Sequence, residues 1–152
     1  MKIFVDADAS PVQNEVIQTA EKFASKVFLV KSYAHFSHDP LPPHVQVIYV
    51  DKGADVADFE IVSRIQAGDI VITQDYGLAS ICLAKKAHVL HHKGFAYTNE
   101  NIDRLLDVRH TNAKLRRAGY KTKGLQGFTN EESEQFQQAF EALLSKIKNN
   151  SK

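Results

Sequence analysis

The sequence predicts an α/β fold, a three-layer α/β/α sandwich with a central, mainly parallel sheet of five strands and added C-terminal helices. Five short apolar runs alternate along the chain with segments of helical periodicity, which is typical of strand–helix–strand units in parallel sheets. The chain has 152 residues, of which 43% are hydrophobic and 24% charged, as in one soluble globular domain. We therefore expect a single domain over residues 1–148, followed by a frayed tail at 149–152.

The first half of the pattern contains three predicted strands, at Lys2–Val5, Val27–Val30 and Val45–Val50. After the first strand, Ser10 is expected to cap a helix that ends near Ser25, and Gln13 completes a capping box. The segment from Ser32 to His44 contains three of the four prolines and has no helical pattern. We therefore expect a loop between the second and third strands.

The rest of the chain continues the alternation and then becomes helical. Its predicted elements are a helix at Asp55–Gln66, a strand at Ile70–Thr73, a helix at Leu78–Lys85 and a strand at His88–His91. Thr98 is expected to cap a helix that runs into a basic segment, and Thr129 with Glu132 forms a capping box for a final helix. An apolar stripe should pack this last helix on the body; its members are Phe136, Phe140, Leu143 and Ile147.

Compartment and redox chemistry follow from what the sequence lacks. No apolar run approaches the roughly 20 residues of a membrane-spanning helix, and the first residues do not have the pattern of a secretory signal. Cys82 is the only cysteine, which excludes an internal disulfide and a cysteine-rich zinc cluster. We expect a cytoplasmic protein without a membrane partner, in which Cys82 is a small buried side chain.

Charge is distributed unevenly, although the net charge is only +1. Residues 1–103 carry 9 basic and 13 acidic side chains, whereas residues 104–152 carry 10 and 5. Most of the positive excess lies at 104–123, where Asp107 is the single acidic residue. An acidic body with one basic segment favours a cation site beside an anion-binding surface, although a solvated helix face also produces such a run.

The positions of the aspartates are the strongest indication of function. Asp6 and Asp8 follow the first strand, and alternation along an extended chain points both side chains the same way. Asp75 follows the fourth strand, while Asp55 and Asp58 open the preceding helix and share a face. Sites in open α/β sheets form beyond the carboxyl ends of the strands, where the strand order reverses. With a strand order of 3-2-1-4-5, Asp6, Asp8 and Asp75 converge at that crevice.

Converging carboxylates favour a metal ion. Two unit charges ~4 Å apart repel by about 4 kcal/mol at an effective dielectric near 20, and hard oxygen donors without cysteine favour Mg²⁺ or Mn²⁺. Such an ion generates hydroxide and orients a phosphodiester, so metal-assisted phosphoryl hydrolysis is the favoured reaction class. Each aspartate alone has a simpler explanation: Asp55 as a helix cap, and Asp6 or Asp8 as a turn residue.

Four segments carry a family resemblance that extends from residue 1 to about 145: VDADASPV at 5–12, GADVAD at 53–58, GDIVITQDYGLA at 68–79 and YTNENI at 97–102. They resemble the YaiI/YqxD family of bacterial proteins, which is placed among the PIN-like domains. The resemblance implies a PIN-like sandwich, and PIN domains are typically Mg²⁺- or Mn²⁺-dependent ribonucleases. Asp6, Asp58 and Asp75 match their acidic positions, with Asp8 and Asp55 as additions characteristic of this family.

Two departures from the family pattern stand out. Ser10 occupies the position where the family usually has cysteine, so thiol chemistry is absent at this position. The segment Gly124–Gly127 lacks the Gly-Pro pair that the family tends to carry near the C-terminus.

Nucleic-acid contacts are predicted in the basic segment. The candidate phosphate-binding residues are Arg109, Lys114, Arg116 and Arg117, and such contacts give salt-dependent affinity that is largely independent of sequence. The candidates for stacking on single-stranded bases are Tyr76, Phe95, Tyr97 and Tyr120, although packing in the core or at its rim is the simpler role for each. The seven histidines are expected mostly at the surface or in packing.

Three functions remain open at this point. The favoured one is a Mg²⁺- or Mn²⁺-dependent phosphodiesterase acting on RNA, in which Asp6, Asp8, Asp58 and Asp75 are catalytic or bind metal and Asp55 is a further ligand. The second is a haloacid-dehalogenase-like phosphatase that uses Asp6 and Asp8 as nucleophile and acid. The third is a PIN-like module that binds RNA or a protein without cutting.

Overall fold

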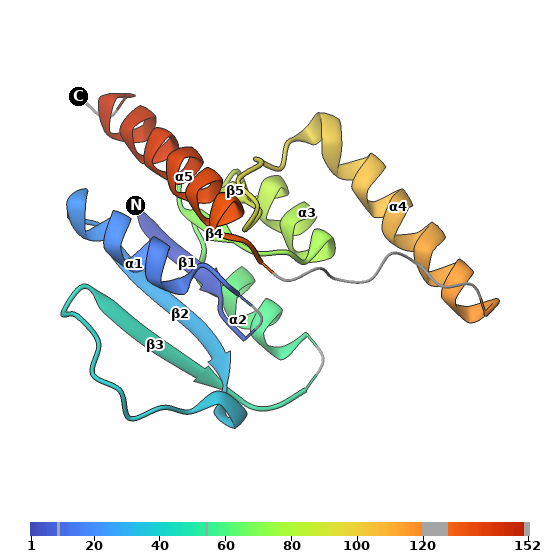
Figure 1. Cartoon of the computed structure of the whole chain (residues 1–152), viewed down its shortest axis with the longest axis horizontal. Coiled ribbons are helices and arrows are strands. Elements are labelled where there is room, and N and C mark those ends of the chain that lie inside the picture. Colours follow the sequence, from blue (N-terminus) through green and yellow to red (C-terminus); the bar gives the residue numbers. More distant parts are fainter. Residues whose placement is uncertain (9, 54, 120–127, 151–152) are drawn as a thin grey trace.

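The computed structural model describes residues 1–8, 10–53, 55–119 and 128–150 (Figure 1). In chain order the elements are β1 (Lys2–Asp6), α1 (Gln13–Lys22), β2 (Lys26–Ser32), the short 3₁₀ helix η1 (Tyr33–His35), β3 (Val45–Val50), α2 (Val56–Arg64), β4 (Ile70–Ile72), α3 (Tyr76–Ala84), β5 (His88–Leu90), α4 (Asn99–Arg117) and α5 (Asn130–Asn150).

The five strands form one sheet, all parallel, in the order β3-β2-β1-β4-β5. This confirms the predicted sheet and the assumed strand order. Ile3 in β1 pairs with Val27 in β2 on one side and with Ile70 in β4 on the other. Because all strands run in the same direction, their carboxyl ends share one edge, and the order reverses between β1 and β4.

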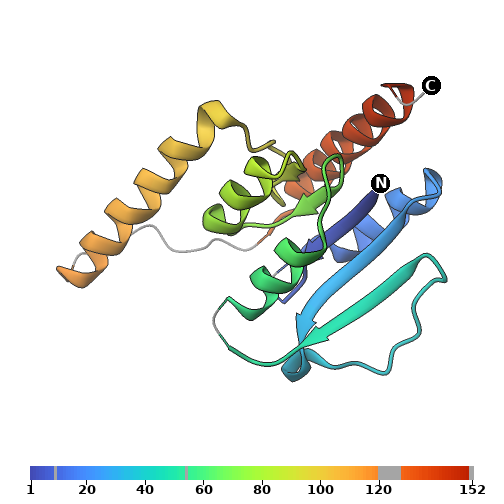
Figure 2. The ribbon, with the colours of Figure 1, turned by 180° about the vertical axis from the view of Figure 1, so that it is seen from behind.

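Helices cover both faces of the sheet, so the predicted three-layer sandwich is confirmed (Figures 1 and 2). On one face, α1 and α5 bury Val16, Phe136 and Phe140 against Ile3 and Val5. Full burial of one such side chain stabilises the fold by about 1.5–3 kcal/mol. The last helix therefore packs on the body as its apolar stripe predicted, and Leu144 joins the fully buried residues.

On the opposite face, α2 and α3 lie side by side over the sheet, and the first half of α4 packs on α3 (Figure 2). Ile61 and Cys82 are fully buried there against Phe4 and Val71. The buried thiol agrees with the expectation for the single cysteine. The second half of α4 extends away from the body.

Several element boundaries differ from the predicted ones. The first helix begins at Gln13 rather than after Ser10, because the Gln13 side chain donates to the Ala7 carbonyl at 2.8 Å and forms no capping box. It ends at Lys22, three residues before the predicted end. The helix α3 begins at Tyr76, two residues early, because Asp75 caps it.

The C-terminal region follows the predictions closely. Thr98 caps α4 in a full capping box, and Thr129 and Glu132 exchange hydrogen bonds at the start of α5. The helix α5 continues to Asn150, two residues into the predicted tail, and 151–152 lie outside the described residues. Between β2 and β3 only η1 interrupts the proline-rich loop. Within the described residues, every helix is too short or too polar to cross a bilayer.

Candidate functional site

The carboxyl ends of β1 and β4 are joined by the side chain of Thr73. Its hydroxyl donates to Asp6 Oδ2 at 3.0 Å and accepts from the Asp75 amide at 3.0 Å. Asp75 Oδ1 in turn accepts from the Leu78 amide at 3.1 Å, which caps α3. The Tyr97 hydroxyl donates to the Thr73 carbonyl at 3.1 Å. Backbone and side-chain bonds thus fix Asp6 and Asp75 next to each other.

Asp6 and Asp75 both line a cavity of about 650 Å³ at this edge of the sheet. The other residues that line it are Gln74, Tyr76, His91, His92, Lys93 and Arg116. Burial raises the pKa of Asp6 above its ordinary value near 3.8, and the charges of Asp75 and Asp8 raise it further, against the opposing hydrogen bond from Thr73. The cavity therefore combines a carboxyl group of raised pKa with the cationic side chains of Lys93 and Arg116.

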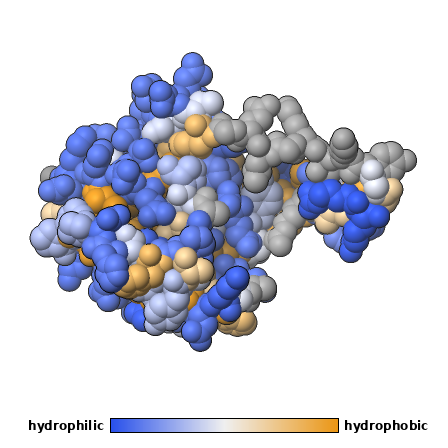
Figure 3. Space-filling view, turned by 60° about the horizontal axis from the view of Figure 1, so that its bottom comes forward, coloured by the Kyte–Doolittle hydropathy of each residue, from blue (hydrophilic) through white to orange (hydrophobic). Residues whose placement is uncertain are grey.

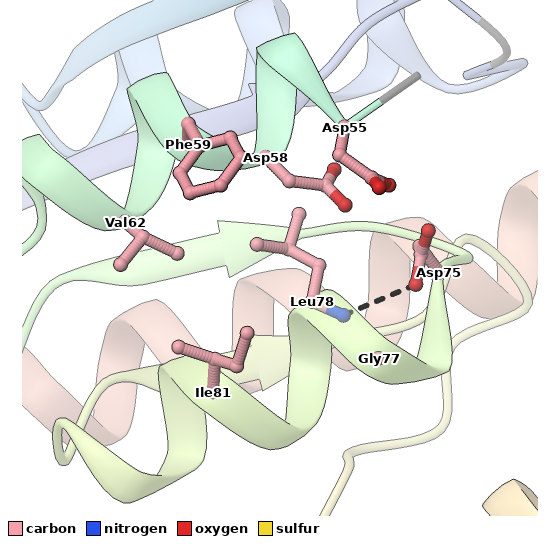
Figure 4. Close-up of a pocket in the computed structure, with 8 residues that line it drawn as sticks. All are labelled: Asp55, Asp58, Phe59, Val62, Asp75, Gly77, Leu78 and Ile81. Carbon is pink, nitrogen blue, oxygen red and sulfur yellow. Dashed lines mark hydrogen bonds between the residues drawn. The ribbon is translucent and has the colours of Figure 1, made fainter.

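A second cavity, of about 310 Å³, lies between α2 and α3 and also has Asp75 in its wall. Figure 4 shows the carboxylates of Asp55 and Asp58 at one end, facing Asp75 across the opening. The other end is lined by apolar side chains: Phe59, Val62, Leu78 and Ile81, together with Gly77. Since Asp75 belongs to both linings, the two cavities adjoin.

The simpler explanation for Asp55 does not hold. Its side chain makes no capping hydrogen bond to α2, although it occupies the N-cap position. Its backbone has a positive φ of 66°, which is uncommon for any residue other than glycine. This conformation places the Asp55 carboxylate in the wall of the cavity instead of on the helix end.

Asp8 does not join Asp6 and Asp75 in the crevice as predicted. Both of its carboxylate oxygens accept from the Ser32 amide, at 3.0 and 3.1 Å, and Oδ1 lies 2.8 Å from His35 Nδ1. The strand β1 ends at Asp6 and a turn follows, so the alternation expected of an extended chain does not reach Asp8. Asp8 therefore links β1 to the end of β2 and to η1, and lines neither cavity.

The donor atoms that the aspartates offer around the two cavities are of the type that hard cations prefer. Asp6, Asp55, Asp58 and Asp75 offer only oxygen, as Mg²⁺ and Mn²⁺ prefer. Among the described residues, however, no three His, Cys, Asp or Glu side chains are grouped closely enough to form a complete metal site. The arrangement fits Mg²⁺ in the form it usually takes, held by one or two carboxylates with water and substrate phosphate completing its shell.

Two histidines that the sequence did not single out line the larger cavity. His91 stacks on Phe95 at 4.5 Å between ring centroids, and burial lowers its pKa to about 3, so it is neutral. Burial also lowers the pKa of His92. The sequence could have indicated them as site residues because they directly follow β5, at the carboxyl edge of the sheet.

The predicted stacking residues have different environments. Tyr97 is buried and hydrogen-bonded to Thr73, so its ring is not exposed for stacking. Tyr76 lines the larger cavity, and Phe95 is 37% exposed. Tyr120 lies outside the described residues.

Of the predicted phosphate-binding residues, Arg116 lines the larger cavity. Lys114 and Arg117 are exposed on the same end of α4, where hydrophilic side chains stand away from the body (Figure 3). Arg109 lies within α4, and its side chain is outside the described part of the chain, as is the segment Gly124–Gly127. Lys93, which the sequence did not single out, adds a second cation to the same wall.

The comparisons with known proteins agree with the resemblance seen in the sequence. A family model described as "Uncharacterized BCR, YaiI/YqxD family" matches residues 4–146. The chain belongs to the YaiI/YqxD family. A UPF0178 protein of Oceanobacillus iheyensis is 51% identical over 146 residues, covering 96% of this chain and all of that protein. A UPF0178 protein of Bacillus thuringiensis subsp. konkukian is 50% identical over 144 residues, covering 95% and 99%. No solved structure matches the chain significantly.

Proposed function

We propose that this YaiI/YqxD family member is a Mg²⁺- or Mn²⁺-dependent phosphodiesterase acting on RNA in the cytoplasm, with a PIN-like site at the carboxyl edge of its sheet. One observation carries the proposal: carboxylates from the ends of β1 and β4 and from the start of α2 line two adjoining cavities, and Lys93 and Arg116 line the larger one with them. Metal-dependent cleavage of a phosphodiester needs both kinds of group, because the metal requires anionic ligands and the phosphate requires cations.

Asp75 is central to the proposed site because, among the described residues, it is the one that lines both cavities. We expect it to hold the metal together with Asp6 on one side or Asp58 on the other. When bound, the ion would lower the pKa of a coordinated water and polarise a phosphoryl oxygen. The capping bond from the Leu78 amide to Asp75 Oδ1 orients this carboxylate at the start of α3, where both cavities meet it.

Asp6 has a second role in the proposal. Its raised pKa favours proton uptake near the reacting water, as is typical of a general base in a buried carboxylate cluster. Thr73 fixes the orientation of the Asp6 carboxylate through Oδ2. Lys93 and Arg116, which line the same cavity, contact the phosphate and stabilise the charge that develops on its oxygens.

The test is calorimetric titration of the protein with Mn²⁺, followed by cleavage assays on a fluorescent RNA oligonucleotide. The Asp6→Asn/Asp75→Asn variant should lose saturable Mn²⁺ binding and cleavage while keeping its circular dichroism spectrum. Asp103→Asn, an exposed aspartate on α4, is the matched control and should behave like the wild type. Equal cleavage by the wild type and the double variant would overturn the proposal.

The alternatives predict other outcomes of the same experiment. RNA binding that survives in the double variant, with no cleavage by any form, supports a PIN-like binding module. A covalent phosphate on Asp6 would support the phosphatase alternative, in which Asp8 acts as the acid. The geometry disfavours this reading, because both Asp8 oxygens are acceptors for the Ser32 amide at the end of β2.

A further inference from the structure

The smaller cavity has an apolar half that metal chemistry does not require. Phe59 and Val62 extend from α2 toward Leu78 and Ile81 on α3 (Figure 4). Phe59 is 75% exposed and Ile81 48% exposed, although both border a cavity of about 310 Å³. Exposed apolar side chains that flank one cavity mark a binding site more often than those scattered singly.

Three kinds of surface follow one another along the two cavities. The apolar end comes first, the carboxylates of Asp55 and Asp58 come next, and Lys93 and Arg116 lie beyond Asp75. A ribonucleotide presents three matching parts in the same order: a flat base, a sugar with hydroxyl donors, and a phosphate. We propose that the smaller cavity is a nucleoside subsite, in which the base of one substrate nucleotide packs against Phe59 and its ribose hydroxyl donates to Asp55.

The apolar end suits a single aromatic ring system. The volume of about 310 Å³ is at the lower end of the range for small-ligand pockets. Stacking of a base on an aromatic side chain is tolerant of sequence, because every base has a π-face. The subsite therefore selects for the presence of a base rather than for its identity.

The carboxylate of Asp55 gives the subsite a way to distinguish ribose from deoxyribose. A carboxylate is a pure acceptor, and acidic side chains bind ribose 2′-hydroxyls in other nucleotide sites. Because the 2′-hydroxyl is the group that separates RNA from DNA, Asp55 would favour ribonucleotides. This inference rests on the proposed function, since the phosphate must lie at the metal and cation site beyond Asp75.

The test uses small ligands that contain no phosphodiester and so cannot be cleaved. Adenosine 5′-monophosphate, its 2′-deoxy form and ribose 5-phosphate are titrated in Mg²⁺ buffer against ¹⁵N-labelled protein, with NMR shifts of the Leu78 and Ile81 amides as the readout. The base should tighten binding about tenfold over ribose 5-phosphate. The 2′-hydroxyl should contribute about tenfold over the deoxy form.

Variants separate the two contacts. Phe59→Ala should remove the advantage of the base and Phe59→Tyr should retain it, because only the ring is needed. Asp55→Asn should reduce the difference between the ribo and deoxy forms. Equal binding of all three ligands, shifts confined to residues outside α2 and α3, or no binding at millimolar ligand would each overturn the subsite. Metal binding and RNA cleavage are measured separately on the Phe59→Ala variant. If both persist while the subsite fails these tests, the proposed function stands without the subsite.

Discussion

The hydroxyl of Thr73 donates a hydrogen bond of 3.0 Å to Asp6 Oδ2, across a separation of 67 residues in the sequence. The same oxygen accepts from the Asp75 amide, so one side chain contacts both members of the central pair, one through its carboxylate and the other through its backbone. Thr73 is nearly fully buried, and water does not readily replace these bonds. The geometry of the candidate site therefore depends on a residue that is not among its proposed metal ligands.

Removing this hydroxyl should weaken both the fold and the site. Thr73→Val keeps the shape of the side chain but leaves Asp6 and the Asp75 amide each without one partner, which costs about 1–3 kcal/mol of unfolding free energy. Chemical denaturation measures this loss. Thr73→Ser, which keeps the hydroxyl, should lose less than half as much. Equal losses in the two variants would mean that packing of the methyl group, rather than the hydrogen bonds, is what matters.

Replacing Asp6 should raise thermal stability at neutral pH. The folded protein holds a proton on Asp6 at higher pH than the unfolded chain does, because burial and neighbouring carboxylates raise this pKa above 3.8. Wild-type stability therefore falls as pH rises from the unfolded-state to the folded-state pKa of Asp6, and the penalty is present in full above the folded-state pKa. Asp6→Asn removes the charge while keeping an acceptor for Thr73. Single stabilising substitutions commonly contribute about 0.5–2 kcal/mol.

The pH dependence is the diagnostic part of the Asp6 experiment. Melting temperatures of the wild type and Asp6→Asn should be close at acid pH, where Asp6 is protonated, and should diverge toward pH 7.5 in metal-free buffer. Asp103→Asn should show no such divergence, since Asp103 is exposed. A gap that is constant with pH would contradict the raised pKa.

Gly94 allows a test of how α5 docks. Its φ is 96°, and a Cβ at this position would meet the Gln135 carbonyl oxygen at 3.0 Å. Gly94→Ala should therefore destabilise the fold by more than the roughly 1 kcal/mol expected from backbone strain alone. Gly68→Ala is the matched control, because Gly68 has a φ of 90° with no atom within 4 Å of the added Cβ. Denaturation midpoints that shift equally would show that α5 yields to the added methyl group.

Lys93 and Arg116 should contribute electrostatically to RNA affinity. Each contact with a phosphate of single-stranded RNA adds about −0.7 to the slope of log affinity against log salt. The Lys93→Ala/Arg116→Ala variant should bind a labelled oligonucleotide more weakly and show a shallower slope by fluorescence anisotropy. Lys146→Ala, near the C-terminal end of α5 and in neither cavity lining, should leave the slope unchanged. An unaltered slope in the double variant would mean that Lys93 and Arg116 do not contact the RNA phosphates.

Much of the fold could be predicted from the sequence because the apolar runs are short and their periodicity is unambiguous. The runs at Ile70–Ile72 and His88–Leu90 are strands as expected, the first buried throughout and the second buried at Val89 and Leu90. The predicted start of the first helix was wrong because a local sequence pattern, Ser10 to Gln13, resembles a capping box. In the structure Gln13 bonds instead to Ala7, a partner earlier in the chain. Local motifs compete with contacts that only the folded chain provides.

The site was predicted in outline, and its details were not. Asp6 and Asp75 could be placed together because parallel strands end at one edge, whereas the direction of Asp8 depended on where β1 stops. Thr73 carries no chemical signal in the sequence, since its importance comes from a partner 67 residues away. His92 and Lys93 likewise reach the site only through the position of β5 at the end of the sheet.

The helix α5 contributes no residue to either cavity, yet Phe136 and Phe140 complete the core beneath β1 and β4. During synthesis, the strands that carry Asp6 and Asp75 emerge long before these two rings do. Until then α1 alone covers this face of the sheet, and Ile3, Val5 and Ile70 are only partly buried. A nascent chain therefore exposes part of its apolar core until the final helix is synthesised, and chaperones that bind apolar segments would protect it until that helix docks.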